Sequence, residues 1–310
     1  MKTVLITGIL GFLGQNLSRA FITNGWQVYG IDDLSVGCRG WLPNEVIFIQ
    51  QNICDPLPKL PRVDLIIHLA SRKIPREGNS RQVLYENTMG LMNIFYYALL
   101  SEDYTRFIYL STSDVYGKNK TFSETSDSII GQPDIQRWSY AISKMWGEQL
   151  LYSTPNNFNF NIVRLFGAYG PYHALSWTAG PQSVFISQAL KKEPITIHGD
   201  GFQERAFQFV DDAVDGIIKV AESGYKREIF NIGNPYEPVS INMLASKIWK
   251  MINPGLPAKL THVLPSKLKY EEIQARVPDI SKAKRLLGFD PKIGLDEGLA
   301  KTIEWQKTVI

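Results

Sequence analysis

The chain has 310 residues, of which 44% are hydrophobic and 20% are charged, with a formal net charge of +3 at pH 7. This length suits one large domain or two medium ones, and the composition is that of a soluble globular protein. Charges of both signs are dispersed, and no apolar run approaches the ~20 residues of a membrane span, so we expect neither nucleic acid nor a membrane as partner. Cys38 and Cys54 form no metal-binding pattern. We therefore predict no metal site and a reducing compartment, the cytoplasm.

A strand, a glycine-rich turn and a helix open the chain. The strand covers residues 4–6, the glycines stand at positions 8, 11 and 14, and the helix runs from about 15 to 24. Glycines let the backbone approach a pyrophosphate, and a helix N-terminus favours its negative charge. A second strand, at 27–31, ends at Asp32, whose carboxylate suits an adenosine ribose and disfavours a 2'-phosphate. This unit predicts NAD rather than NADP.

Further strand–helix units follow. We predict strands at 46–49, 63–70, 107–110 and 160–166, with a long helix at 82–100. The strand at 63–70 is apolar on both faces, as buried parallel strands are. The hydroxyls of residues 111–113 follow a strand, where they would point into a ligand crevice. The sequence thus predicts an α/β fold with a Rossmann-type doubly wound parallel sheet.

Tyr140 and Lys144 form a candidate acid/base pair. In a helix, residues four apart share one face, one turn apart. The ammonium would favour the phenolate and lower the tyrosine pKa from about 10 towards working pH. Such a tyrosine can take a proton from a sugar hydroxyl while hydride leaves the same carbon. The spacing alone fits an ordinary surface helix equally well. A second pair, Tyr116 and Lys120, has Gly and Asn between its members, which predict a turn.

The pattern breaks up after residue 166. Loops alternate with helices at about 183–192, 211–222 and 240–252. We interpret residues 1–166, together with about 205–233, as an NAD-binding domain and 167–310 as mainly a nucleotide-sugar-binding lobe. Arg205 and Arg276 are candidate anion clamps, because a guanidinium matches phosphate oxygens. A surface ion pair is the alternative for either one.

Several motifs lie in order along the chain: Thr7-Gly8-x-x-Gly11-Phe12-x-Gly14, His68-Leu69-Ala70, Ser111-Thr112-Ser113-Asp114-Val115-Tyr116-Gly117, Tyr140-x-x-x-Lys144, Arg164-Leu165-Phe166-Gly167, Gly199-Asp200-Gly201 through Arg205-Ala206-Phe207, Phe230-Asn231-Ile232-Gly233 and Arg276-Val277-Pro278-Asp279. As an ordered set they resemble the extended short-chain dehydrogenase/reductase family. The later motifs are typical of its NAD-dependent branch that acts on nucleotide sugars, the epimerases and dehydratases. The resemblance covers essentially the whole chain.

The resemblance implies a set of roles. It places Thr112 on the 4-hydroxyl of the sugar, Tyr140 as the base, Lys144 on the nicotinamide ribose, and Asp114 as a further catalytic candidate. It implies cofactor contacts from Gly8, Gly11, Phe12, Leu13, Gly14, Asp32, Asn52, Ile53, Leu69, Ala70, Lys73, Asn87, Tyr140 and Lys144. It implies substrate contacts from Ser113, Gln182, Arg205, Arg276 and Asp279.

Two positions depart from the family pattern. Asn52 stands where relatives often have Asp, and Gly167 stands where many have an Asn that touches the substrate. The loop at 176–182 is the alternative source of the second contact. The family also implies a homodimer formed through the helices at 82–100 and 138–152, although burial within one subunit would explain their apolar faces equally well.

Different motifs favour different reactions after oxidation at C4 of the sugar. Asp114 stands where dehydratases and UDP-glucuronate decarboxylases of the family carry Glu, and Arg205-Ala206-Phe207 is also decarboxylase-like. Lys73 resembles the lysine of 4-epimerases, and the Pro-rich loop usual in decarboxylases is absent. We predict 4-epimerisation of a UDP-sugar, with decarboxylation or dehydration as alternatives.

Two alternative functions lie outside this group of reactions. An idle NAD-sensing protein is disfavoured by the intact Thr112, Tyr140 and Lys144. A ketone reductase using NADP is disfavoured by Asp32.

Overall fold

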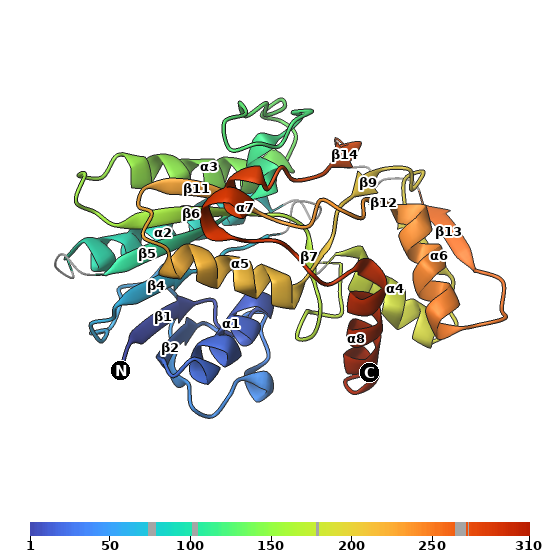
Figure 1. Cartoon of the computed structure of the whole chain (residues 1–310), viewed down its shortest axis with the longest axis horizontal. Coiled ribbons are helices and arrows are strands. Elements are labelled where there is room, and N and C mark those ends of the chain that lie inside the picture. Colours follow the sequence, from blue (N-terminus) through green and yellow to red (C-terminus); the bar gives the residue numbers. More distant parts are fainter. Residues whose placement is uncertain (74–78, 101–104, 178–179, 264–270, 272) are drawn as a thin grey trace.

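Seven parallel strands form the central sheet of the computed structural model (Figure 1). The structure describes residues 1–73, 79–100, 105–177, 180–263, 271 and 273–310. The strand order is β11-β6-β5-β4-β1-β2-β3, which confirms the predicted doubly wound sheet. These strands are β1 (Thr3–Thr7), β2 (Gln27–Asp32), β3 (Ile47–Gln50), β4 (Leu65–His68), β5 (Arg106–Thr112), β6 (Phe160–Leu165) and β11 (Glu228–Ile232).

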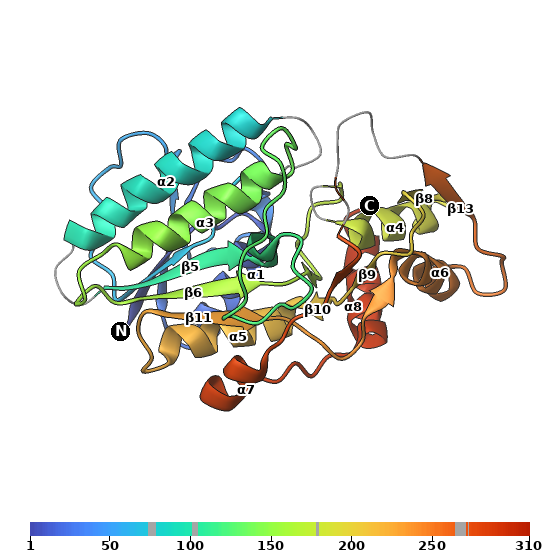
Figure 2. The same cartoon turned by 90° about the horizontal axis from the view of Figure 1, so that it is seen from above.

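Helices cover both faces of this sheet, which explains why its strands are apolar on both sides. α1 (Phe12–Thr23) and α5 (Val210–Glu222) pack on one face, and α2 (Ser80–Leu100) and α3 (Trp138–Tyr152) pack side by side on the other (Figure 2). Neighbouring strand residues accordingly enter different cores. Val4 and Ile6 pack with α1 residues such as Leu17, whereas Leu5 packs with Leu91 and Ile94 of α2.

The first helix begins earlier than predicted. α1 starts at Phe12 with Gly11 as its extended N-cap, so Gly14 lies inside the first turn. A Cβ at Gly14 would come within 2.5 Å of the Ile9 Cα, and the helix can approach the preceding turn only because this residue has no side chain. The second Tyr/Lys pair lies in a turn, as predicted. Gly117 ends the short helix η2 (Ser113–Tyr116) with a φ of 60°.

The remaining chain builds a lobe beside the carboxyl ends of the sheet strands (Figure 1). Its larger helices are α4 (Pro181–Leu190), α6 (Ile241–Ile252) and α8 (Leu295–Lys307). Two-stranded sheets pair β7 (Ala168–Tyr169) with β10 (Gln208–Phe209) and β8 (Ile195–His198) with β13 (Leu260–Val263). A third, three-stranded sheet joins β12 (Val239–Ser240), β9 (Glu204–Arg205) and β14 (Ala275–Arg276). The two short helices outside these groups are η1 (Arg39–Trp41), after β2, and α7 (Ser281–Leu287), which packs against β11.

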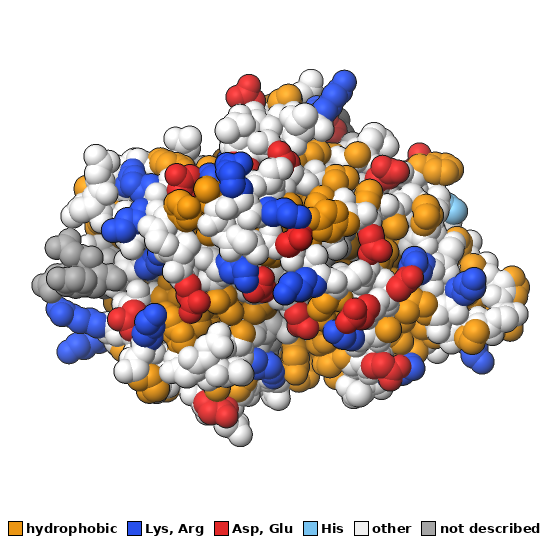
Figure 3. All heavy atoms as spheres, in the orientation of Figure 1, with side chains coloured by type: hydrophobic (Ala, Val, Ile, Leu, Met, Phe, Trp, Pro, Cys, Tyr) orange, Lys and Arg blue, Asp and Glu red, His pale blue; other side chains and the backbone are white. Residues whose placement is uncertain are grey.

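The chain returns from the lobe to the sheet. α5 packs against β5, β6 and β11, and β11 adds the seventh strand beside β6. We propose on this basis that residues of about 205–233 belong with the NAD-binding domain, apart from β9 and β10 at their start, which pair within the lobe. Within the described residues, no helix is both long and apolar enough to cross a bilayer. On the face shown in Figure 3, basic and acidic side chains are interspersed with apolar ones.

Candidate active site

A cavity of about 840 Å³ lies where the carboxyl ends of the sheet strands meet the lobe. The chain leaves β1 and β4 towards opposite sides of the sheet, and ligands of doubly wound folds bind at such a point. Its wall includes the glycine turn, the ends of β4 and β5, the start of α3, and the first residues of α4. The cavity is large by the standard of ligand sites, which span about 300–1,000 Å³.

The glycine turn has the geometry of a phosphate cradle. Gly8 has a φ of 69°, and a Cβ there would lie 2.8 Å from the backbone of Ala70. The N-terminus of α1, capped by Gly11 without a side-chain hydrogen bond, lies at the same wall. Backbone N–H groups at such a terminus favour an anion.

Asp32 ends β2 beside this turn. Its carboxylate accepts hydrogen bonds from the backbone N–H groups of Leu10 and Leu34, each at 3.0 Å. Burial raises the pKa of Asp32, although these two hydrogen bonds oppose the rise. The side chain therefore holds the turn and the following loop in place at the edge of the cavity.

Most other predicted cofactor residues line the cavity, namely Phe12, Leu13, Asn52, Ile53, Leu69, Ala70 and Lys73. Asn87 does not line the cavity, and the structure gives its amide another use. It is buried in α2, its Oδ1 accepts the Arg72 N–H at 2.7 Å, and its Nδ2 donates to the Arg72 carbonyl and to Ser143 Oγ. The amide thus fastens the loop after β4 to α2 and α3.

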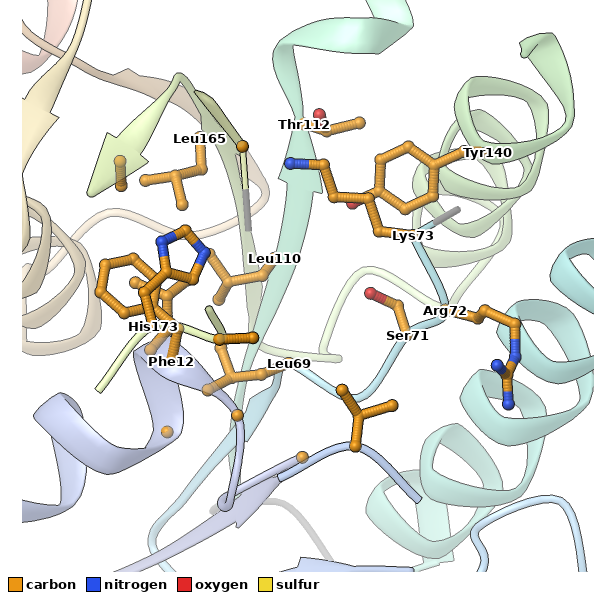
Figure 4. A pocket seen from close by; sticks show the side chains of 18 of the residues that line it. Phe12, Leu69, Ser71, Arg72, Lys73, Leu110, Thr112, Tyr140, Leu165 and His173 are labelled. Carbon is orange, nitrogen blue, oxygen red and sulfur yellow. The ribbon is translucent and has the colours of Figure 1, made fainter. Parts of the chain in front are cut away.

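Thr112 and Tyr140 lie close together in the cavity wall (Figure 4). Thr112 ends β5, and α3, which carries Tyr140, packs against that strand. Burial raises the pKa of Tyr140 and the Asp114 carboxylate raises it further, whereas side-chain hydrogen bonds with Ser71 and Thr112 lower it. The predicted fall in this pKa is therefore wrong for the structure described here.

Lys144 does not act on the Tyr140 phenol as expected. Its side chain is 2% exposed, and its Nζ donates to the Leu110 carbonyl at 2.7 Å. The Nζ lies 5.9 Å from the Tyr140 ring centre. Burial lowers the pKa of Lys144 to about 7, and the carboxylate of Glu148 offsets part of this shift.

Glu148 forms a buried ion pair behind Lys144. Arg164 of β6 donates to its two carboxylate oxygens from Nε at 3.0 Å and from Nη2 at 2.6 Å. The Ser111 hydroxyl donates to the same carboxylate at 2.5 Å. These contacts join α3 to β5 and β6 and fix the helix that carries Tyr140. The motif at 164–167 was recognised in the sequence, but this structural use of Arg164 was not.

Asp114 lies in η2, within a group of cations. Arg276 Nη1 is 2.6 Å from its Oδ1 and Arg137 Nη2 is 3.3 Å away. Burial opposes ionisation of Asp114, but Arg276, Arg137 and Lys73 hold its pKa well below the usual range. Asp114 is thus a carboxylate that organises two arginines, and Arg276 is engaged by it rather than by solvent.

Arg137 was missed as a site residue. It lines the cavity and stands three residues before Tyr140 at the start of α3. This spacing places the two side chains on neighbouring positions of the helix and could have signalled that Arg137 also faces the site.

The lobe contributes Gln182, Arg205 and Arg276 to the cavity, opposite Ser113. Gln182 is 3% exposed, and its Nε2 has no hydrogen-bond partner among the described residues. Of the loop at 176–182, Trp177 also lines the cavity, while residues 178 and 179 lie outside the described part of the chain.

Asp279 is not part of this site, contrary to expectation. Its side chain is exposed, and its carboxylate accepts the Ser281 N–H at 2.9 Å at the start of α7. It borders a separate hollow of about 440 Å³ together with Glu228 and Lys282. Its motif neighbour Arg276 reaches the cavity because β14 pairs with β9 at the cavity wall.

Residues 4–233 match the model of the "NAD dependent epimerase/dehydratase family". The chain belongs to this family. A UDP-N-acetyl-alpha-D-glucosaminuronate decarboxylase of Bacillus cytotoxicus is 33% identical over 99% of this chain and 98% of its own length. Among solved structures, the UDP-glucose 4-epimerase of Thermotoga maritima is 26% identical with a TM-score of 0.89, and the alignment covers 99% of each chain. The UDP-glucuronic acid 4-epimerase of Bacillus cereus, solved with UDP-glucuronic acid and NAD, is 27% identical with a TM-score of 0.84 and covers 99% of this chain and 100% of its own.

Family membership makes the protein an NAD-dependent nucleotide-sugar enzyme. The site fits this cofactor, because the glycine turn leads into the N-terminus of α1 and Asp32 lies at the end of the adjacent strand. When bound, NAD supplies the acceptor for a hydride from the sugar. The comparisons include both decarboxylases and 4-epimerases, so they do not distinguish the reaction that follows.

Proposed function

We propose that this protein is a UDP-sugar 4-epimerase and that its preferred sugar is a uronic acid. The observation that carries the proposal is the state of Asp114. It is held ionised between Arg276 and Arg137, so it is poorly suited to donate a proton near C5 or C6. Removal of water across C5 and C6 would need such a donor, whereas epimerisation at C4 does not.

In this mechanism the residues of the chain act on the 4-hydroxyl. Thr112 orients that hydroxyl, and Tyr140 accepts its proton as hydride leaves C4. Burial and Asp114 raise the pKa of Tyr140, and hydrogen bonds with Ser71 and Thr112 oppose this rise. The positive charge of an oxidised nicotinamide beside the phenol would lower the pKa further and favour the phenolate that accepts the proton. The 4-keto sugar then turns within the cavity, and Tyr140 returns the proton as hydride is delivered to the other face.

The cations around Asp114 support the choice of a uronic acid. Arg276, Arg137 and Lys73 place three positive charges around one carboxylate, so a second carboxylate would be bound favourably there. The Bacillus cereus 4-epimerase was solved with UDP-glucuronic acid, which agrees with this inference. Cations that bind the sugar carboxylate also oppose its loss as carbon dioxide, because the negative charge they stabilise would leave C6.

Decarboxylation is the second candidate. It is favoured by the acidic residue at position 114 and by the relation to a UDP-sugar decarboxylase at 33% identity. The purified enzyme should therefore be offered UDP-glucuronate, UDP-N-acetylglucosaminuronate, UDP-glucose, UDP-N-acetylglucosamine and dTDP-glucose. A product of unchanged mass with an inverted C4 proton by NMR would establish epimerisation. Loss of carbon dioxide or water by mass spectrometry would refute it.

Asp114→Asn separates the two reactions further. If Asp114 only organises the arginines, epimerisation should fall by less than about tenfold, whereas removing an acid/base group typically costs about 10²–10⁴-fold. The initial rates of C4 inversion and of carbon dioxide release should be measured for both proteins. A fall of the larger size would show that Asp114 takes part in proton transfer.

We also propose a homodimer in which a second copy covers α2 and α3. Large apolar side chains are exposed on both helices, including Tyr85 and Tyr96 on α2 and Ile142 and Trp146 on α3. The two helices lie side by side (Figure 2), and an exposed apolar surface of this kind favours association. A single monomeric species in sedimentation velocity would contradict the proposal.

A further inference from the structure

Two segments border the cofactor side of the cavity, and both are attached to α1. The first, residues 35–42, follows β2 and contributes Cys38 and Trp41 to the cavity wall. It is held by Gln15, whose Nε2 donates to the Cys38 carbonyl at 2.9 Å, and by Arg19, whose Nη2 donates to the Trp41 carbonyl. This segment runs beside the helix whose N-terminus forms the phosphate cradle.

The second segment, residues 171–173, follows β7 and crosses the same helix from the lobe side. Asn16 Nδ2 donates to the Pro171 carbonyl at 3.1 Å, and the Arg19 guanidinium lies 4.0 Å from the Tyr172 ring centre. The His173 ring stacks on Phe12 with centres 4.0 Å apart, at the cavity wall (Figure 4). Tyr172 has a φ of 67°, a conformation that a non-glycine residue keeps only when its surroundings enforce it.

Trp305 of α8 joins the two segments. Its ring centre lies 5.3 Å from that of Trp41 and 5.6 Å from that of Tyr172. The ring centres of Trp41 and Tyr172 lie 6.1 Å apart, and the ring planes of all three pairs are steeply inclined to each other. Edge-to-face and tilted contacts of this kind stabilise aromatic pairs beyond the area they bury. α8 is itself tied to α4, since Gln306 Nε2 donates to the Ser183 carbonyl at 2.8 Å.

We infer that Trp41, Tyr172 and Trp305 form an aromatic clasp that retains NAD and sets the rate of its release. NAD bound at the glycine turn would be enclosed by the segments that carry Trp41 and Tyr172, and the clasp holds both in place. Trp305 is then a positioning residue, because it supports the wall without itself lining the cavity. The inference requires NAD at the glycine turn and is independent of which sugar is bound.

A retained cofactor suits the proposed reaction, since epimerisation takes hydride and returns it within one turnover. The clasp joins the lobe to the NAD-binding domain on the cofactor side of the cavity, away from the contacts on the sugar side. The sugar side is joined through the Asp114–Arg276 pair, and the cofactor side is joined through the three rings.

The test is a chase experiment on the full chain. Protein loaded with isotopically labelled NAD is mixed with a large excess of unlabelled NAD, and bound label is followed over time without any sugar. Because Trp305→Ala removes two aromatic contacts, we expect release to accelerate by roughly tenfold. Trp305→Phe keeps a ring at this position and should release labelled NAD at an intermediate rate. This second variant tests the inference even if the alanine variant folds poorly.

Trp26→Ala is the matched control. Trp26 is also half-buried and also makes a steep ring contact, with Phe21 at 5.2 Å, but it lies away from the cavity. Its label should leave at the parental rate. The inference is overturned if both Trp305 variants release NAD at the parental rate, or if Trp26→Ala accelerates release as much as Trp305→Ala. Since no sugar is present, failure of the proposed epimerisation would not affect the result.

Discussion

Tyr140→Phe is expected to abolish turnover while leaving the fold and NAD binding intact. The substitution removes one hydroxyl from a residue that is 7% exposed and lines the cavity beside Thr112 and Ser71. The ring and its packing on the wall are kept, so stability should change little. Loss of the group proposed to move the proton should lower kcat by at least about 10²–10⁴-fold, the usual contribution of an acid/base group.

Tyr152→Phe provides the control for this experiment. It makes the same chemical change on the same helix, but Tyr152 lies at the far end, where its hydroxyl donates to the Arg227 carbonyl at 3.1 Å. Its kcat should stay close to the parental value. Turnover by C4 inversion, bound NAD and the melting temperature should be measured for both variants. Near-parental turnover in Tyr140→Phe would rule out the mechanism proposed here.

Glu148→Ala is expected to cause the largest loss of stability. Glu148 and Arg164 are both almost fully buried, and three hydrogen bonds converge on the Glu148 carboxylate. Removing the carboxylate leaves an uncompensated guanidinium in the interior, which typically costs about 3–5 kcal/mol. The free energy of unfolding from urea titration, with the m-value checked for each protein, measures the effect.

Two further variants test the cause of this loss. Asp215→Ala breaks the exposed Lys219–Asp215 pair on α5 and should change stability by less than about 1 kcal/mol. Glu148→Leu combined with Arg164→Met removes both charges and should recover much of the loss, because apolar residues often replace a buried ion pair at little cost. If Glu148→Ala were no more destabilising than Asp215→Ala, burial of the pair would not be its source of stability.

The local features of this protein could be read from the sequence alone. Strand, glycine turn, helix and acid follow one another within 32 residues, and their order is set by backbone preferences and hydrophobic periodicity. The spacing of Tyr140 and Lys144 needed only the geometry of a helix, and α3 carries both. Where a boundary moved, as at the start of α1, the helix took in Gly14, at which a Cβ would come within 2.5 Å of the Ile9 Cα.

The electrostatics of the site depended on tertiary structure. The pKa of Tyr140 rises rather than falls because burial and Asp114 dominate, while Lys144 donates to a carbonyl of β5. Charge spacing along a sequence cannot predict this, since desolvation depends on everything packed around a group.

Local pattern along the chain predicted the strands and helices of the doubly wound fold, the glycine turn, the acid at the end of β2 and the helix of Tyr140, because each depends on residues close in sequence. Only the tertiary structure paired Asp114 with Arg276, engaged Asn87 in the loop after β4, left Asp279 outside the cavity, and brought Trp41 to Trp305. These partners are far apart in the chain. Their contacts depend on how the lobe packs against the sheet, which residue type and local spacing do not specify.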